Sequence, residues 1–255
     1  MGGEQFIATT GVKQKRVASE SVTSSDLCFE AAEKLIAELN WEKAEIDALV
    51  FVTQSPAYRT PASSCILQDR LGLPQSCFTL DISLGCSGWV YGLSVIASLM
   101  QSGGIRRGLL LAGDTVLKMC SSEDKSTYPL FGDAGTCTAV EFDPEAFPMT
   151  FAMHTDGSGA EAIIVPSGGF RNRESPESFE MVDYGEGIVR NSLQVSMEGM
   201  SVFTFGISKA PKVVNELLGV IGENSNDIDY FTFHQANLFM NEKIRKKLKL
   251  HEEQV

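Results

Sequence analysis

The sequence predicts a fold of the α/β class, and three observations support this prediction. The runs ALVFV at 48–52 and GLLLA at 108–112 are continuously apolar, which is typical of strands buried on both faces in a parallel sheet. The segment CFTLDI at 77–82 is apolar enough to form another buried strand. Helical patterns separate these strands along the chain. Strands that alternate with helices indicate an α/β domain.

The first periodic helix is expected directly after Thr23. Thr23 and Asp26 have the spacing of a capping box, in which each side chain accepts a hydrogen bond from the backbone N–H of the other residue. Asn40 is expected to end this helix. A second helix is expected to open at Pro61, which is suited to the first turn, and to close at Gly72.

The second part of the chain has a less regular pattern. A strand is expected at 136–142 and a long helix at about 200–221, in which Pro211 should start a new segment or introduce a kink. A further strand, YFTF, is expected at 230–233, with another helix after it. The segment 168–180 has no clear period, so we expect an exposed loop there.

Cys86 lies in the turn between the strand at 77–82 and an apolar helix. Gly85 and Gly88 flank it, so the backbone can turn sharply and a substrate can approach closely. A thiol at a helix N-terminus meets the positive end of the helix dipole, which favours the thiolate. We therefore predict an activated nucleophile, on a helix buried in the protein's centre because apolar residues occupy most of its sides. The alternative is an inert core cysteine.

His234 occupies the corresponding place at the end of the expected strand at 230–233. Ligand sites in α/β proteins gather at the carboxyl ends of parallel strands. We therefore interpret His234 as the reactive partner of Cys86. A structural histidine is the alternative interpretation.

The composition argues against several classes of function. With 33 acidic and 21 basic residues the formal net charge is -12, which disfavours a general nucleic-acid binder and a protein of anionic membrane surfaces. Six cysteines without CxxC pairs, together with three histidines, do not make a zinc framework. The cysteines indicate reduced thiols, and we find neither a signal peptide nor an apolar run long enough to span a bilayer. We therefore expect a cytoplasmic protein without a metal site.

Six motifs, in order along nearly the whole chain, resemble the β-ketoacyl-acyl carrier protein synthase III family of the thiolase superfamily. They are TTGVKQKR, DISLGCSGWVYGLSVI, DKSTYPLFGDAGT, HTDGSG, MEGMSVFTF and DIDYFTFHQANL. The resemblance implies a homodimer with a five-layered αβαβα fold built from two related β/α halves. These are 1–150, with the nucleophilic cysteine, and 151–255, with the catalytic histidine. The family's opening strand falls ahead of Met1 and its catalytic asparagine beyond Val255, so we expect a fold incomplete at both ends.

The resemblance implies a condensing enzyme of fatty-acid or related biosynthesis, with no tightly bound cofactor. Cys86 would take an acyl group as a thioester, from acyl-coenzyme A or an acyl carrier, and its own N–H would help to bind the oxyanion. Malonyl-acyl carrier protein would then lose carbon dioxide, and the resulting carbanion would attack the acyl group. His234 would donate a hydrogen bond to the malonyl carbonyl and stabilise the enolate. Asn237 belongs to the HQAN motif and is not assigned the role of the family's asparagine.

Several positions that contact the substrate in the family carry other residues here. Gln5 and Thr9 stand where many members place an aromatic residue and an arginine against the adenine end of coenzyme A, and Phe239 replaces a further arginine. These departures weaken the expectation of the usual acyl-coenzyme A primer. Lys125 replaces another arginine and keeps its charge but not its planar fork. Thr60 replaces a bulky aromatic residue, which indicates a roomier acyl pocket. The predicted substrate-binding residues are Thr60, Lys125, Gly132 and Phe203.

A basic helix after His234 suggests a surface for an acidic partner. Five cations fall within seven positions of an otherwise acidic chain, while Leu238, Phe239, Ile244 and Leu248 can pack inward. Acyl carrier proteins are acidic, and their phosphopantetheine arm must enter near the catalytic histidine, so such a patch would attract and orient them. The alternative is a solvated helix face. The predicted carrier-protein contacts are Gln235, Ala236, Asn237, Leu238, Lys243, Arg245, Lys246 and Lys247.

Two other functions are compatible with the sequence. An acyltransferase of the same superfamily would form the same acyl thioester on Cys86 but pass the acyl group to an amine or an alcohol. A non-catalytic partner subunit of a condensing enzyme would need neither reactive residue. The presence of both Cys86 and His234 argues against the partner subunit.

Overall fold

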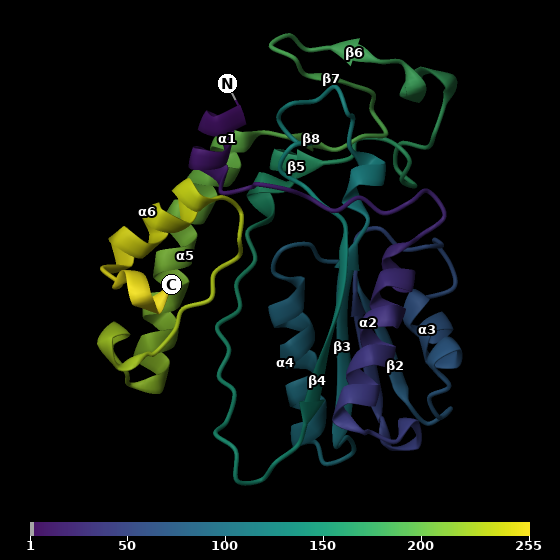
Figure 1. The fold of residues 1–255 in the computed structure, drawn as a ribbon, viewed down its shortest axis with the longest axis vertical. Helices are drawn as coiled ribbons and strands as arrows, with labels where there is room; N and C mark the ends of the chain where they lie inside the picture. Colours follow the sequence, from purple (N-terminus) through teal and green to yellow (C-terminus); the bar gives the residue numbers. More distant parts are fainter. Residues whose placement is uncertain (1–2) are drawn as a thin grey trace. The chain divides into compact units, whose positions relative to one another are not determined.

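The computed structural model of the protein describes residues 3–255 (Figure 1). Contacts divide the chain into two compact units, each assembled from separate segments. The sheet unit consists of Arg16–Lys118 and Gly132–Met149. The helical unit consists of the segment up to Lys15, Met119–Phe131 and Thr150–Val255. The expected division into two related halves at residue 150 stays a prediction.

The sheet unit is built on a four-stranded sheet with the strand order β2-β1-β3-β4. The central strand β1 (Ala48–Val52) runs parallel to both β2 (Phe78–Ile82) and β3 (Arg107–Asp114). The last strand, β4 (Ala134–Glu141), is antiparallel to β3. The expected strands at 48–52 and 108–112 are confirmed. Because β1, β2 and β3 are parallel, the segments that follow them leave the sheet at the same edge.

Helices cover both faces of this sheet (Figure 1). On one face lie α2 (Ser24–Leu39) and α3 (Ser63–Leu71), and on the other lies α4 (Gly88–Gln101). The capping box of Thr23 and Asp26 is present at the start of α2, as predicted. Asn40 and Gly72 end α2 and α3 in the left-handed conformation, which is the usual geometry of a helix C-cap.

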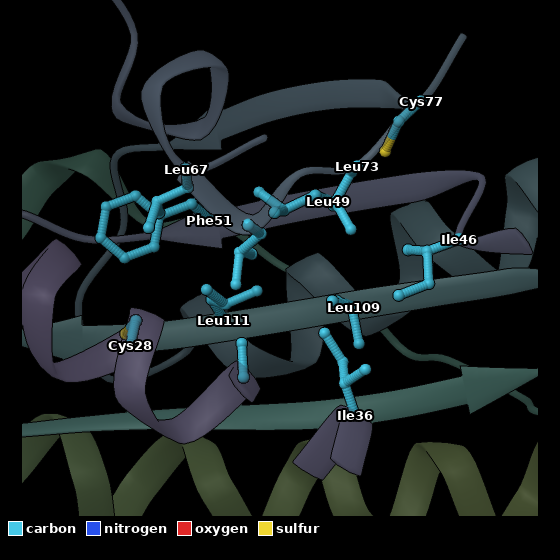
Figure 2. Close-up of a cluster of buried hydrophobic side chains, with 12 residues drawn as sticks. Cys28, Ile36, Ile46, Leu49, Phe51, Leu67, Leu73, Cys77, Leu109 and Leu111 are labelled. Carbon is cyan, nitrogen blue, oxygen red and sulfur yellow. The ribbon is translucent and has the colours of Figure 1, made fainter. Parts of the chain in front are cut away.

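The alternation of side chains along the strands gives the sheet unit two apolar cores. Leu49 and Phe51 of β1 point to the side of α2 and α3, where Figure 2 shows them packed with Leu109 and Leu111 of β3. The intervening side chains point to α4, whose Ile96 and Met100 complete the second core together with Ala48, Val50, Val52 and Leu110. Burial of each large side chain stabilises the fold by about 1.5–3 kcal/mol.

Two expectations about burial were wrong. The strand β2 is half-exposed rather than buried, because it lies at the edge of the sheet. Its first residue, Phe78, is 39% exposed. The helix α4 buries only the stripe of Gly88, Gly92, Ile96 and Met100, whereas Trp89 is 42% exposed. Composition alone could not show this, because a helix that is apolar on every side can still have only one side covered.

The helical unit is held together by the packing of two helices. These are α5 (Gly199–Ile221) and α6 (Leu238–Leu248), and Met240, Ile244 and Leu248 of α6 are buried against α5 and the segment before α6. The unit also contains the helix α1 (Gly3–Thr10) and two short antiparallel ladders. One ladder pairs β5 (Ile163–Ile164) with β8 (Ser196–Met197), and the other pairs β6 (Val182–Asp183) with β7 (Val189–Arg190).

Pro211 does not divide α5, which continues through it. A proline lacks the N–H that would bond to the carbonyl four residues earlier, here that of Ile207. The Nζ atom of Lys247 on α6 donates a hydrogen bond of 3.0 Å to this carbonyl oxygen. A neighbouring helix thus supplies the donor that Pro211 removes.

The strand expected at 230–233 is absent from the described part of the chain. A strand is defined by a ladder of hydrogen bonds, and the N–H of Phe231 makes a single such bond, to the carbonyl of Gln254. Phe231 and Phe233 are both partly buried and stack on one another, with ring centroids 6.3 Å apart. The apolar side chains therefore have a packing role without a sheet.

Short 3₁₀ turns complete the structure. They are Lys43–Glu45, Val116–Met119, Gly157–Ala162, Pro176–Phe179, Ser225–Asp227 and Glu252–Gln254. In the part of the chain from residue 3 onward, no helix is both long and apolar enough to cross a membrane.

Candidate active site

Cys86 lies in the turn that joins β2 to α4, as the sequence predicts. The turn is closed by a hydrogen bond of 2.8 Å from the N–H of Gly88 to the carbonyl of Gly85, and α4 begins at Gly88. A Cβ atom on Gly88 would lie 2.3 Å from Cγ1 of the core residue Val52, so only glycine allows α4 to pack this closely on β1. The Cys86 side chain is exposed at the helix N-terminus, where the dipole favours a thiolate.

The turn with Cys86 rests on the segment that follows β1. A Cβ atom on Gly85 would lie 2.7 Å from Oε1 of Gln54, so this side chain packs closely against the turn. One carboxylate oxygen, Oδ1 of Asp114, accepts hydrogen bonds from the backbone N–H groups of Gln54 and Ser55 at 2.8 and 2.9 Å. It also accepts bonds from the hydroxyls of Thr53 and Ser55 at 2.9 and 2.8 Å.

Exposure separates Cys86 from most of the other cysteines. Burial raises the pKa of the Cys28 and Cys137 thiols to about 12, and that of the Cys77 thiol to about 11. These thiols are therefore protonated near neutral pH and are poor nucleophiles. Cys120 is buried as well, whereas Cys65 is exposed like Cys86. Cys65 does not share the position at the start of α4.

His234 lies exposed in the segment between the stacked phenylalanines and α6. Its carbonyl accepts a hydrogen bond of 2.9 Å from the N–H of Ala236, which turns the chain toward the helix. The side chain of Asn237 is the N-cap of α6 and accepts a bond of 2.8 Å from the N–H of Met240. In the HQAN motif, Asn237 thus sets the direction of the helix that follows the histidine.

The basic residues of α6 fall into two groups. Lys243, Lys246 and Lys247 are exposed. The side chain of Arg245 is only 11% exposed, and its guanidinium bonds to both carboxylate oxygens of Glu242 and to the carbonyl of Leu250. The bond from Arg245 also holds the pKa of Glu242 down at about 2. The expected inward packing is confirmed for Ile244 and Leu248 but not for Leu238 and Phe239, which are 56% and 48% exposed.

Lys125 is an exposed residue on a firmly held segment. Its N–H donates a bond of 3.1 Å to the carbonyl of Gly187. The preceding residue, Asp124, is fully buried and pairs with Arg190 at 2.9 Å. The guanidinium of Arg190 also lies over the ring of Tyr184.

The remaining predicted substrate residues lie in different parts of the fold. Phe203 of α5 stacks on Phe239 of α6 with ring centroids 5.6 Å apart. Thr60 and Gly132 are exposed residues of the sheet unit, as is Cys86. Lys125, Phe203 and His234 belong to the helical unit, so a joint site with Cys86 stays a prediction. Residues 3–255 contain no group of three or more His, Cys, Asp or Glu side chains arranged to hold a metal.

Comparison with known proteins decides the family. The family model for 3-oxoacyl-[acyl-carrier-protein] synthase III matches residues 80–157, and the model of its C-terminal part matches residues 220–255. A β-ketoacyl-[acyl-carrier-protein] synthase III of Caldanaerobacter subterraneus subsp. tengcongensis is 32% identical over 254 residues, which are 99% of this chain and 74% of that protein. The chain belongs to this synthase III family.

Further relatives agree with this assignment. The synthase III of Clostridioides difficile is 32% identical over 97% of this chain and 73% of its own length. A crystal structure of a 3-oxoacyl-(acyl-carrier-protein) synthase III, 39% identical, matches with a TM-score of 0.95 over 98% of this chain and 75% of that chain. The synthase from Burkholderia xenovorans LB400 is 40% identical, with a TM-score of 0.86 over 99% of this chain and 70% of its own.

The family assignment confirms two predictions made from the sequence. The fold is the thiolase-like α/β fold of the synthase III structures, and the protein is an acyl-transferring condensing enzyme of fatty-acid biosynthesis. The hydrogen bonds of Asp114 were not predicted from the sequence. An aspartate at the carboxyl end of an apolar strand, as in GLLLAGD, is a signal that could have identified Asp114, because polar residues at strand ends lie where ligand sites form.

Proposed function

We propose that Cys86 is the residue that becomes acylated in this condensing enzyme. The observation that carries the proposal is its exposed position in the turn at the N-terminus of α4. The Cys86 thiolate attacks the carbonyl carbon of an acyl thioester, and the tetrahedral intermediate expels the carrier thiolate. Backbone N–H groups at the start of the helix stabilise the oxyanion of that intermediate, as donors fixed in place before the reaction do.

His234 serves the second half-reaction. Malonyl-acyl carrier protein loses carbon dioxide, and the electron pair of the broken bond passes into an enolate. A hydrogen bond from His234 to the malonyl thioester oxygen stabilises this enolate. The enolate carbon then attacks the acyl group on Cys86, and the cysteine leaves as thiolate. The exposed position of His234 directly before the capped helix α6 supports this role.

Four further residues contact the substrate in this proposal. Lys125 binds a phosphate of the primer through its exposed ammonium, and the buried pair of Asp124 and Arg190 holds its segment. Thr60, Gly132 and Phe203 line the path of the acyl chain. The primer is an acyl-coenzyme A or an acyl carrier thioester, and the protein needs no tightly bound cofactor.

The exposed lysines of α6 bind acyl carrier protein. Lys243, Lys246 and Lys247 present positive charge, and Gln235, Ala236, Asn237 and Leu238 add contacts near His234. Arg245 belongs to the same set, but its donors are bonded within the unit, so its part is to order the helix. An acidic carrier protein suits this surface.

The active protein is a homodimer of the cytoplasm. The outer edge of β2 has no strand partner in the part of the chain described, and an unpaired edge is a ready site for a second copy. The six cysteines are free thiols, as suits a reducing compartment. Sedimentation equilibrium of the purified protein tests the dimer, and a monomer at every concentration would contradict it.

A condensation assay tests the proposed reaction. The protein is incubated with an acyl thioester and malonyl-acyl carrier protein, and the β-ketoacyl carrier product is measured by mass spectrometry. Cys86→Ala should abolish the product, whereas Cys65→Ala, which removes the other exposed thiol, should retain it. Transfer of the acyl group to an added amine or alcohol, without a β-ketoacyl product, would refute the condensation.

A further inference from the structure

We propose that Asp114 is a positioning residue that fixes the loop beneath the Cys86 turn and so sets the reactivity of the thiol. The inference rests on the proposed role of Cys86 as the acylated residue. Asp114 is the last residue of β3, and the loop that it holds, 53–55, directly follows the neighbouring parallel strand β1. Asp114 acts through loop 53–55 and does not contact the substrate in this proposal.

Asp114 acts as a clamp on loop 53–55, which leaves the sheet. Other hydrogen bonds also reach this loop: the N–H of Thr53 donates to the carbonyl of Ile82 at 3.1 Å, and the hydroxyl of Ser24 donates to the carbonyl of Ser55 at 2.8 Å. The ladder between β1 and β3 ends with the pair Val52 and Ala112, so it does not hold the residues beyond. Oδ1 of Asp114 replaces the ladder with four hydrogen bonds of 2.8–2.9 Å to this loop. The hydroxyl of Ser55 in turn accepts a bond of 2.9 Å from the N–H of Thr115.

Loop 53–55 touches the Cys86 turn directly before the cysteine, where the side chain of Gln54 lies against Gly85. After the cysteine, Gly88 lies against Val52, the last residue of β1, which directly precedes the loop. A shift of loop 53–55 would therefore move the turn that carries the thiol. Such movements affect rate strongly, since a displacement of about 1 Å can cost about 10²-fold in an enzyme.

The four hydrogen bonds to Oδ1 of Asp114 suit a carboxylate side chain better than an amide. A carboxylate oxygen accepts several hydrogen bonds, and bonds to an ionised acceptor are shorter and stronger than those to a neutral one. Asparagine can place a neutral oxygen at the same point but holds the same four donors less strongly. Alanine removes the acceptor altogether. Asp114→Asn should therefore lower the acylation rate less than Asp114→Ala does.

Asp47 provides a matched control at the opposite edge of the same sheet. Its Oδ2 atom accepts bonds from the N–H groups of Arg106 and Arg107 at 2.8 and 3.1 Å, so it also ties the β1 segment to the β3 segment. It lies at the amino ends of these strands, whereas Cys86 follows a carboxyl end. Asp47→Asn should lower stability without altering the thiol.

The experiment compares Asp114→Asn, Asp114→Ala and Asp47→Asn with the unsubstituted enzyme. Three quantities are measured: thermal stability, the acylation rate with an acyl thioester, and the pH profile of Cys86 alkylation by iodoacetamide. We expect Asp114→Ala to slow acylation about 10²-fold. The acylation rate of Asp114→Asn should lie between those of Asp114→Ala and the unsubstituted enzyme. In both variants the pH dependence of Cys86 alkylation should change. Asp47→Asn should keep the rate and the profile of the unsubstituted enzyme.

Two results would overturn the inference. One is a folded Asp114→Ala whose acylation rate and alkylation profile equal those of the unsubstituted enzyme. The other is an equal loss of rate in Asp47→Asn, because Asp114 would then act through general stability. Asp114→Asn, which keeps the side chain's size, decides the question if Asp114→Ala does not fold. Failure of the proposed role of Cys86 would give a different result from failure of this inference: acyl label would then appear on a residue other than Cys86 in the unsubstituted enzyme.

Discussion

At the scale of single residues, the environment of each thiol explains why one cysteine suits nucleophilic catalysis. Burial raises the pKa of the Cys28, Cys77 and Cys137 thiols well above neutral pH, which keeps them protonated and inert. Cys65 and Cys86 are both exposed, so exposure alone does not distinguish them. Only Cys86 stands in the turn ahead of α4, where helix N–H groups and the dipole stabilise negative charge.

The role of His234 can be separated from that of Cys86 by following the two half-reactions independently. We expect His234→Ala to form the acyl-Cys86 intermediate at a nearly normal rate but to lose condensation by about 10²–10³-fold, the usual cost of removing a donor to a developing oxyanion. Release of carbon dioxide from malonyl-acyl carrier protein measures the second half-reaction. Undiminished decarboxylation in this variant would show that His234 does not stabilise the enolate.

At the scale of the element, the charge of α6 can be reversed at two lysines whose contacts lie within that helix. Lys246 pairs with Glu242 at 3.1 Å, and Lys243 lies 5.2 Å from the ring centroid of Phe239. Lys243→Glu with Lys246→Glu reverses two exposed charges, and we expect weaker binding of acyl carrier protein with a smaller dependence on salt. Acylation of Cys86 by a small carrier-free thioester should be unchanged. Lys247 is left intact because it bonds to α5.

The matched control for this pair is Lys34→Glu with Arg173→Glu, which makes the same change in charge at exposed positions outside α6. It should leave carrier-protein binding almost unaltered. Equal weakening in both double variants would assign the effect to overall charge. An equal loss with carrier-bound and carrier-free substrates would indicate damage to the fold.

The link between α5 and α6 gives a prediction about stability. Lys247→Met removes the donor to the Ile207 carbonyl and should lower the free energy of unfolding by about 1 kcal/mol. Pro211→Ala restores the N–H that α5 lacks at this carbonyl, so the same Lys247 substitution should cost less in that background. Urea unfolding of the four proteins in this double-mutant cycle measures the coupling. Strictly additive effects would contradict the shared acceptor.

At the scale of the whole molecule, the features predicted well from the sequence are those that local residues determine. The capping box at Thr23, the buried strand β1 and the turn with Cys86 each follow from a short run of residues. The features that were missed depend on partners distant in sequence. The segment 230–233 has the composition of a strand but no ladder, and the exposed faces of β2 and α4 follow from their places in the sheet unit.

The candidate site shows the same division between local and distant information. Cys86 and His234 were predicted from their motifs, whereas the clamp of Asp114 joins segments 59–61 residues apart. Arg245 was counted with the exposed cations because its bond to the Leu250 carbonyl cannot be inferred from a charge pattern. Side-chain hydrogen bonds of this kind require the fold before they can be assigned.

Peptide mapping is the direct test of whether the enzyme carries its acyl group on Cys86. The unsubstituted protein is incubated with an acyl thioester at neutral pH, without malonyl-acyl carrier protein, and digested under conditions that preserve thioesters. Mass spectrometry should find the added acyl mass on the peptide that contains Cys86 and on no other cysteine. Acyl label on Cys65 or a buried cysteine, with Cys86 unmodified, would contradict the account.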